Sequence, residues 1–113
     1  MTQAPNQAYD RDKLVELFGD DPRTLAEVER EFLDTAREAA REIKGTDDLT
    51  VIARAAHRLK GASGMIGALA LRQIAEAVER SAKAEDLSTV RRLREMFDHE
   101  VRRVAEQAGI PVE

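Results

Sequence analysis

The spacing of apolar side chains most constrains the fold, because it repeats at intervals of three and four residues along most of the chain. The pattern is clearest between Pro22 and Gly45. There the apolar positions are Leu25, Val28, Phe32, Ala36, Ala39 and Ile43. This spacing gathers apolar side chains on one stripe of an α-helix. No segment of useful length alternates apolar and polar residues, so we expect no β-strand and predict an all-α fold.

Capping residues mark the ends of the first two helices. Asp10 can cap a short helix that runs to Phe18. Asp21 then serves as the N-cap of a long helix, with Pro22 at the first helical position, where its missing N–H costs nothing. Gly45 supplies the stop signal of the long helix.

The third helix is predicted to begin at Thr46 or Asp47, either of which can cap it. Its apolar residues keep the same spacing and lead into residues 61–67, a segment that contains three glycines. Because glycine weakens helices, we expect this segment to loosen the helix and turn the chain.

Two more helices complete the predicted fold. We expect the fourth from about Gly67 to Ala84. Asp86 can cap a fifth helix, whose apolar spacing runs without interruption to Gly109. Four long amphipathic helices joined by short connections favour an antiparallel up-down-up-down four-helix bundle, with the short first helix lying across one end.

The 113 residues are predicted to form one domain with a single core. We expect an ordered bundle over about residues 9–109, with residues 1–8 and 110–113 frayed. The net charge of −4 argues against nucleic acid as the main partner, and no apolar stretch is long enough to span a membrane. The absence of cysteine excludes a disulfide scaffold and suits a reducing cytoplasm. The helices suffice for a monomeric bundle.

His57 is the residue that points most clearly to chemistry. On a helical wheel it lies one step off the core stripe, on the flank that faces solvent. Its neighbours on that flank are Ala53, Lys60, Gly61 and Gly64. Two glycines cost a helix about 1 kcal/mol each relative to alanine, so we expect them to serve as clearance for the backbone of a partner.

An exposed imidazole beside a lysine suits phosphoryl transfer. Neutral imidazole is a nucleophile near neutral pH, and Lys60 can neutralise phosphoryl oxygens as a point charge. The alternative is that His57 is an ordinary solvated residue. His99 has no second histidine one turn away, so we interpret it as a surface residue and expect no metal site. The chain also lacks the glycine motifs that bind ATP phosphates.

A longer pattern surrounds His57. Residues 56–68 read AHRLKGASGMIGA, and the pattern continues with Leu71, Ile74, Val78 and Glu79. This pattern resembles the signature of the histidine-containing phosphotransfer (HPt) domains of two-component phosphorelays. The upstream plan of a short helix before a long one is also similar, so the resemblance covers about residues 9–104.

The resemblance implies that His57 accepts a phosphoryl group through Nε2, and that Lys60 and Gly61 border it as phosphate partner and clearance residue. In HPt domains of the chemotaxis-kinase type, a glutamate at the spacing of Glu79 accepts a hydrogen bond from Nδ1–H and orients the imidazole. A simple antiparallel register would bring Gln73 opposite the imidazole instead, so both arrangements remain open.

The resemblance also implies a docking surface for receiver domains around the imidazole. Its expected members are Ala53, Arg58, Gly61 and Gly64. Met65 and Ile66 are further candidates if they do not belong to the core.

The implied function is that of a phosphohistidine carrier rather than a classical enzyme. One receiver domain would pass the phosphoryl group of its aspartyl phosphate to His57, which would pass it to the aspartate of a second receiver. A hybrid sensor histidine kinase is a further expected partner. The chain itself needs no cofactor, and Mg²⁺ is expected on the receiver only.

Two alternatives remain open at this point. One is a helical adaptor or inhibitor that binds a kinase or receiver without carrying phosphate. The other is the dimerisation and phosphorylation fragment of a sensor kinase, although the His-Glu box followed by proline that is typical of that fragment is absent.

Overall fold

The computed structural model describes residues 7–111, which form helices and connecting turns. The elements are α1 (Arg11–Phe18), α2 (Pro22–Lys44), α3 (Leu49–Ile66), α4 (Leu69–Lys83), α5 (Leu87–Leu93), the 3-10 turn η1 (Arg94–Met96) and α6 (Phe97–Ala108). No strand occurs in this part of the chain, which confirms the prediction of an all-α fold. Within the same residues, no helix is both long enough and apolar enough to cross a membrane.

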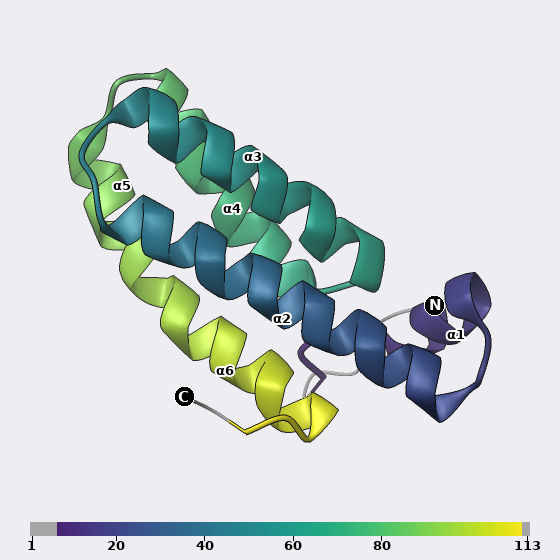
Figure 1. Cartoon of the computed structure of the whole chain (residues 1–113). Helices are drawn as coiled ribbons and strands as arrows, with labels where there is room; N and C mark the ends of the chain where they lie inside the picture. The colour runs from purple at the N-terminus through teal and green to yellow at the C-terminus, as the bar shows by residue number, and fades with distance from the viewer. Residues whose placement is uncertain (1–6, 112–113) are drawn as a thin grey trace.

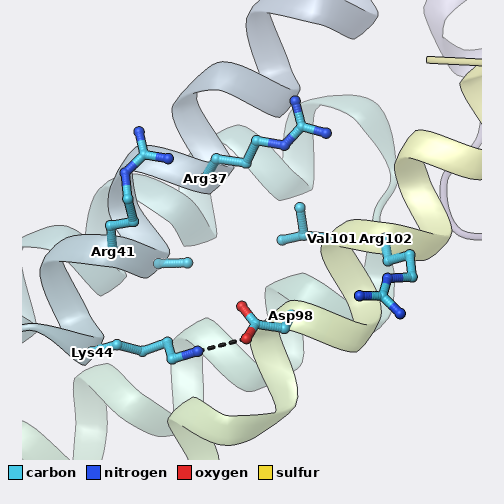
Figure 2. Close-up of a pocket in the computed structure, with 7 residues that line it drawn as sticks. Arg37, Arg41, Lys44, Asp98, Val101 and Arg102 are labelled. Carbon is cyan, nitrogen blue, oxygen red and sulfur yellow. Dashed lines mark hydrogen bonds and ion pairs between the residues drawn. The ribbon is translucent and has the colours of Figure 1, made fainter. Parts of the chain in front are cut away.

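The long helices lie side by side, with α1 at one end and α5 at the other (Figure 1). Helix α3 packs against α2 and α4, and α6 packs against the same two helices. The order around the fold is therefore α2, α3, α4, α6. The α3–α4 pair and the α2–α6 pair consequently form opposite sides, and the α2–α6 side is hollowed into a groove of about 360 Å³ (Figure 2).

The core is built from the apolar stripes that the spacing predicts. In α4 the buried apolar side chains are Leu71, Ile74, Ala75, Val78 and Ala82. In α2 all predicted positions are buried except Val28, which is partly buried. Phe97 and Val104 of α6 are buried in the core. Leu93, at the end of α5, is partly buried and packs against the core. Leucine, isoleucine, valine and alanine thus supply most of the interior.

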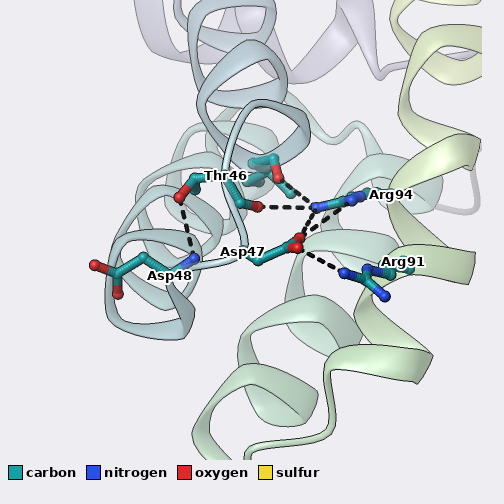
Figure 3. A network of polar contacts seen from close by, with 6 residues as sticks. Thr46, Asp47, Asp48, Arg91 and Arg94 are labelled. Carbon is teal, nitrogen blue, oxygen red and sulfur yellow. Dashed lines mark hydrogen bonds and ion pairs between the residues drawn. The ribbon is translucent and has the colours of Figure 1, made fainter.

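The N-cap of α3 is Asp48, so the prediction of Thr46 or Asp47 is wrong by one or two residues. The Asp48 carboxylate accepts hydrogen bonds from the backbone N–H groups of Thr50 (3.0 Å) and Val51 (3.4 Å). The Thr46 hydroxyl instead accepts the backbone N–H of Asp48 at 3.0 Å. Asp47 is unavailable as a cap because arginines from the last third of the chain bind its carboxylate (Figure 3).

Those arginines lie on α5 and η1. Arg91 pairs with Asp47 at 2.6 Å, and this hydrogen bond is the main reason that the pKa of Asp47 lies below its ordinary value. Arg94 donates to the backbone carbonyls of Ile43 (3.1 Å) and Thr46 (3.0 Å). The prediction of an uninterrupted fifth helix is wrong, because η1 separates α5 from α6. The 3-10 turn coincides with these contacts of Arg94, and no glycine or proline in residues 87–108 predicts it.

The glycine-containing end of α3 does not loosen, contrary to the prediction. Helix α3 continues through Ile66, because its packing against both neighbours outweighs the weak propensity of glycine. Gly67 ends the helix with a φ of 70°, and the Ala68 N–H donates to the Ser63 carbonyl at 2.9 Å. The Asp10 N–H donates to the Ile66 carbonyl at 3.0 Å, which brings the start of α1 against this turn.

The segment before α1 is held by a side chain of α6. The Gln107 Oε1 accepts the backbone N–H groups of Ala8 (2.6 Å) and Tyr9 (3.3 Å), and its Nε2 donates to the Tyr9 carbonyl at 3.1 Å. The buried Tyr9 hydroxyl donates to the buried Glu29 carboxylate. Burial, followed by the contact with Glu29, raises the pKa of Tyr9. This segment therefore belongs to the packed fold.

Packing thus extends beyond the expected span of 9–109. Ala8 is buried, and Ile110 packs against the core, although both were expected to be frayed. Gln7 and Pro111, which belong to the same prediction, are exposed and lie outside the helices, whereas residues 1–6 and 112–113 lie outside the described residues.

Replacing Gly67 with alanine should destabilise the fold by about 2–4 kcal/mol. Its φ lies in the left-handed region, and an added Cβ would lie 2.6 Å from the Asp10 Cβ. Gly109→Ala is the matched control: its φ is 73°, but its added Cβ would have no neighbour within 4 Å, so strain of about 1–2 kcal/mol is expected. Urea unfolding followed by circular dichroism measures both, and equal losses would show that the close approach to Asp10 contributes nothing.

Candidate functional site

His57 lies on α3 with its imidazole exposed, on the flank that faces α4. Its side chain is 69% exposed, whereas Ala56 and Leu59 beside it are buried, as the helical wheel predicts. The Nδ1 atom lies 2.8 Å from Oε2 of Glu79 on α4. Gln73 is exposed and forms no contact with the imidazole, so the structure answers the question that the sequence left open: Glu79 faces His57.

Glu79 is a buried carboxylate surrounded by three cationic or proton-donating side chains. Its side chain is only 6% exposed. Besides His57 Nδ1, it contacts Lys60 Nζ through Oε1 at 2.8 Å and Lys83 Nζ through Oε2 at 3.1 Å. A carboxylate can remain ionised away from water when donors of this kind compensate its lost hydration.

These contacts hold the pKa of Glu79 at about 2. The hydrogen bond from Lys60 is the largest cause, those from Lys83 and His57 add to it, and burial opposes them. Because the folded pKa is depressed, the stabilisation is complete above the ordinary value of 4.5 and is lost as the pH falls towards about 2. Glu79 is therefore an anion throughout the physiological range.

An ionised Glu79 selects the tautomer of a neutral His57. A carboxylate without a proton can only accept, so Nδ1 must carry the hydrogen that lies between the two groups. Nε2 then keeps its lone pair, on an imidazole that is open to solvent. The arrangement leaves Nε2 of an oriented imidazole accessible, as a nucleophilic role would require.

Lys60 does not reach into solvent above the imidazole. Its ammonium pairs with Glu79, and its side chain is 30% exposed. Lys83, which the sequence analysis missed, pairs with the same carboxylate from one turn further along α4 and is 67% exposed. The signal was available, since a lysine four residues after a glutamate forms a favourable helical pair. The Glu79 carboxylate therefore holds two ammonium groups close to His57.

The expected docking residues differ in their exposure and in their contacts. Gly61 is exposed, and an added Cβ would find nothing within 4 Å. At Gly64, an added Cβ would come within 3.6 Å of the Arg72 side chain. Ala53 is partly buried, and Arg58 pairs with Glu42 of α2 rather than facing α4. Small residues thus leave space beside the imidazole.

Apolar side chains are exposed at Met65, next to Gly64, and on helix α1. Met65 is 50% exposed, whereas Ile66 is buried and belongs to the core. Lys13 of α1 donates to the Gly64 carbonyl at 2.8 Å, which places α1 beside this end of α3. Helix α1 exposes Val15, Leu17 and Phe18. The sequence analysis did not include these α1 side chains in the candidate surface.

His99 is exposed on α6, as expected for a surface residue. Among residues 7–111, no group of three or more histidine, aspartate or glutamate side chains is placed to hold a metal ion.

Glu79→Ala should remove the preference for the Nδ1–H tautomer of His57, because the ring loses the acceptor that selects it. Long-range ¹H–¹⁵N spectra of the neutral imidazole distinguish the two tautomers. Glu76→Ala is the matched control, since Glu76 is an exposed glutamate on the same helix. An unchanged tautomer in Glu79→Ala would contradict the orienting role.

Comparison with known proteins assigns the chain to a family. The profile of the Hpt domain matches residues 10–107 of the 113-residue chain, and this confirms the resemblance noted in the sequence. No curated protein and no solved structure matches the chain. The matched span contains His57, Lys60, Glu79 and Lys83. The chain belongs to the Hpt domain family, the histidine phosphotransfer domains of two-component signalling.

Proposed function

We propose that this chain relays a phosphoryl group between receiver domains, from the aspartyl phosphate of one to His57 and on to the aspartate of another. The observation that carries the proposal is the contact between the exposed imidazole and Glu79, at 2.8 Å. A buried anion that fixes Nδ1–H leaves Nε2 as the nucleophilic atom.

The transfer balances without an additional reactant. The Nε2 lone pair attacks phosphorus, and the N–P bond forms while the bond between phosphorus and the aspartyl oxygen breaks. The aspartate leaves with the electron pair as a carboxylate. The imidazole keeps its Nδ1 proton and becomes a cation, which the anionic Glu79 stabilises. Transfer to the second receiver reverses these steps. Mg²⁺ held by the receivers would supply charge neutralisation at the phosphoryl oxygens.

Lys60 and Lys83 are proposed to stabilise the phosphoryl group after it arrives. Both ammonium groups are held next to His57 by their contacts with Glu79, at 2.8 Å and 3.1 Å. A phosphoryl group on Nε2 adds negative charge in front of them, and long lysine side chains can turn towards it. Glu79 would then keep its hydrogen bond with Nδ1 while sharing the two lysines with the phosphoryl oxygens.

The proposed receiver surface combines small and apolar side chains. Ala53, Gly61 and Gly64 provide close approach beside His57, and the exposed apolar residues of α1 extend the surface beyond Gly64. Arg58 lies at its edge, paired with Glu42. A desolvated apolar centre with a charged rim is typical of protein interfaces.

The scaffold for this relay is proposed to be the antiparallel up-down-up-down four-helix bundle expected from the sequence, with α1 across one end. As a monomer in the cytoplasm, it would meet its receivers and a hybrid sensor kinase by diffusion. The bundle needs only to hold one imidazole rigidly, because its partners supply the metal and the phosphoryl donor.

Incubation with a receiver that carries labelled aspartyl phosphate, in Mg²⁺, should label the wild-type chain and leave His57→Gln unlabelled. The label should be stable in base and labile in acid, as expected of a phosphohistidine. His99→Gln, which changes the exposed histidine of α6, is the matched control and should be labelled normally. Binding of the receiver without labelling of the wild type would overturn the relay and favour the adaptor.

Gly61→Gln should weaken receiver binding by about tenfold or more, because a long side chain would fill the clearance beside His57. Gly61→Ala provides the control: it should raise helix stability by about 1 kcal/mol, since its Cβ lies in open space. Calorimetric titration with a receiver measures the affinity. Wild-type affinity in Gly61→Gln, with the fold intact by circular dichroism, would contradict the clearance role.

A further inference from the structure

The groove between α2 and α6 lies on the side of the fold opposite the α3–α4 pair that carries His57. It has a volume of about 360 Å³, and its lining consists of Arg37, Ala40, Arg41, Lys44, Asp98, Val101 and Arg102 (Figure 2). Four of these side chains are cations and one is a carboxylate. The whole chain carries a net charge of −4, so the groove is opposite in sign to the chain as a whole.

Two of the four cations have no partner among the described residues. Lys44 pairs with Asp98 at 2.5 Å across the groove, and Arg37 donates to the Pro111 carbonyl at 3.4 Å. The side chains of Arg41 and Arg102 form no hydrogen bond or ion pair with any residue between 7 and 111. They come from the two facing helices, and Figure 2 shows them on the two sides of the groove.

The cations of α2 form a row rather than a cluster. Arg37, Arg41 and Lys44 follow one another at intervals of four and three residues, which correspond to rises of about 6 Å and 4.5 Å along the helix. A single phosphate would need donors that converge on one point. Carboxylates at the same intervals on another helix would instead match the row along its length.

The floor of the groove suits a packed helix. It is formed by the small side chains of Ala40 and Val101, which are 5% and 8% exposed. Such a floor leaves room for apolar side chains of a partner between the charged side chains of α2 and those of α6. An amphipathic helix with glutamate or aspartate along the edges of its apolar stripe provides both features.

We propose that the α2–α6 groove binds an acidic amphipathic helix of a partner protein. Arg41 and Arg102 pair with carboxylates from opposite sides of that helix, and Lys44 exchanges Asp98 for a carboxylate of the partner. Because the groove and His57 lie on opposite sides, the helix and a receiver can be bound together. The proposal uses no property of the phosphotransfer reaction, so it stands or falls independently of it.

The test uses the full chain and a defined probe. The probe is a helical, alanine-rich peptide of about 20 residues with leucine along one stripe and glutamate at i, i+4, i+7 and i+11. A second peptide has the same composition with the glutamates spread around the helix, and inorganic tripolyphosphate serves as a small polyanion. Fluorescence anisotropy or calorimetry gives the affinity, and amide chemical shifts of Ala40 and Val101 report the location.

We expect the patterned peptide to bind in the groove and to shift both amides. The double variant Arg41→Ala with Arg102→Ala should weaken binding about threefold to thirtyfold, the range that two exposed ion pairs supply. Arg80→Ala, an exposed arginine of α4, is the control and should leave binding unchanged. Asp98→Ala should tighten binding, because it removes the carboxylate that competes for Lys44.

Several results would overturn the proposal. Equal weakening by Arg80→Ala would indicate general attraction between unlike charges. Equal affinity of the two peptides would show that the cations of α2 do not recognise the spacing of the glutamates. Preference for tripolyphosphate over the patterned peptide would indicate a small-anion site. Absence of binding by the patterned peptide at low salt, where exposed charges act most strongly, would remove the groove as a docking site for acidic helices.

Discussion

The close packing of α3 against α4 is the constraint on which the site depends. Helices α3 and α4 pack against each other, and both bury small side chains: Ala55 and Ala56 on α3, and Ala75 and Ala82 on α4. Alanine lets two helices approach closely, so a side chain as short as glutamate can reach across from one to the other. His57 and Glu79 are 22 residues apart in the chain, yet their side chains meet at 2.8 Å.

The electrostatics of the site follow from burying that glutamate. A buried carboxylate is tolerated only when donors replace its water, and here an imidazole and two lysines do so. The same cluster is consistent with catalytic use, because the donors sit next to the atom that would bind the phosphoryl group. Glu79 therefore links stability and chemistry: the contacts that lower its pKa also set the tautomer of His57. A single residue on α4 therefore selects the tautomer of the imidazole on α3.

The sequence predicts features that depend on local patterns, and it fails where distant parts of the chain decide. The apolar stripes, the Asp10, Asp21 and Asp86 caps and the exposure of His57 follow from spacing and local chemistry. The choice between Gln73 and Glu79 required the register of α3 against α4, which one sequence does not contain. Likewise, η1 coincides with the contacts of Arg94 with the α2–α3 connection. The turn before α5 needs no glycine, because Glu85 itself takes a positive φ of 58°.

The arginines of this chain divide into those that bind the fold together and those that face outward, and sequence alone does not separate them. Arg94 is engaged by two backbone carbonyls and Asp47, so its charge is used within the molecule. Arg41 and Arg102 have no such partners between residues 7 and 111, although they line a groove with an apolar floor. Positive charge beside an apolar floor, in a chain that is acidic overall, therefore favours recognition of an acidic partner over a role in stability.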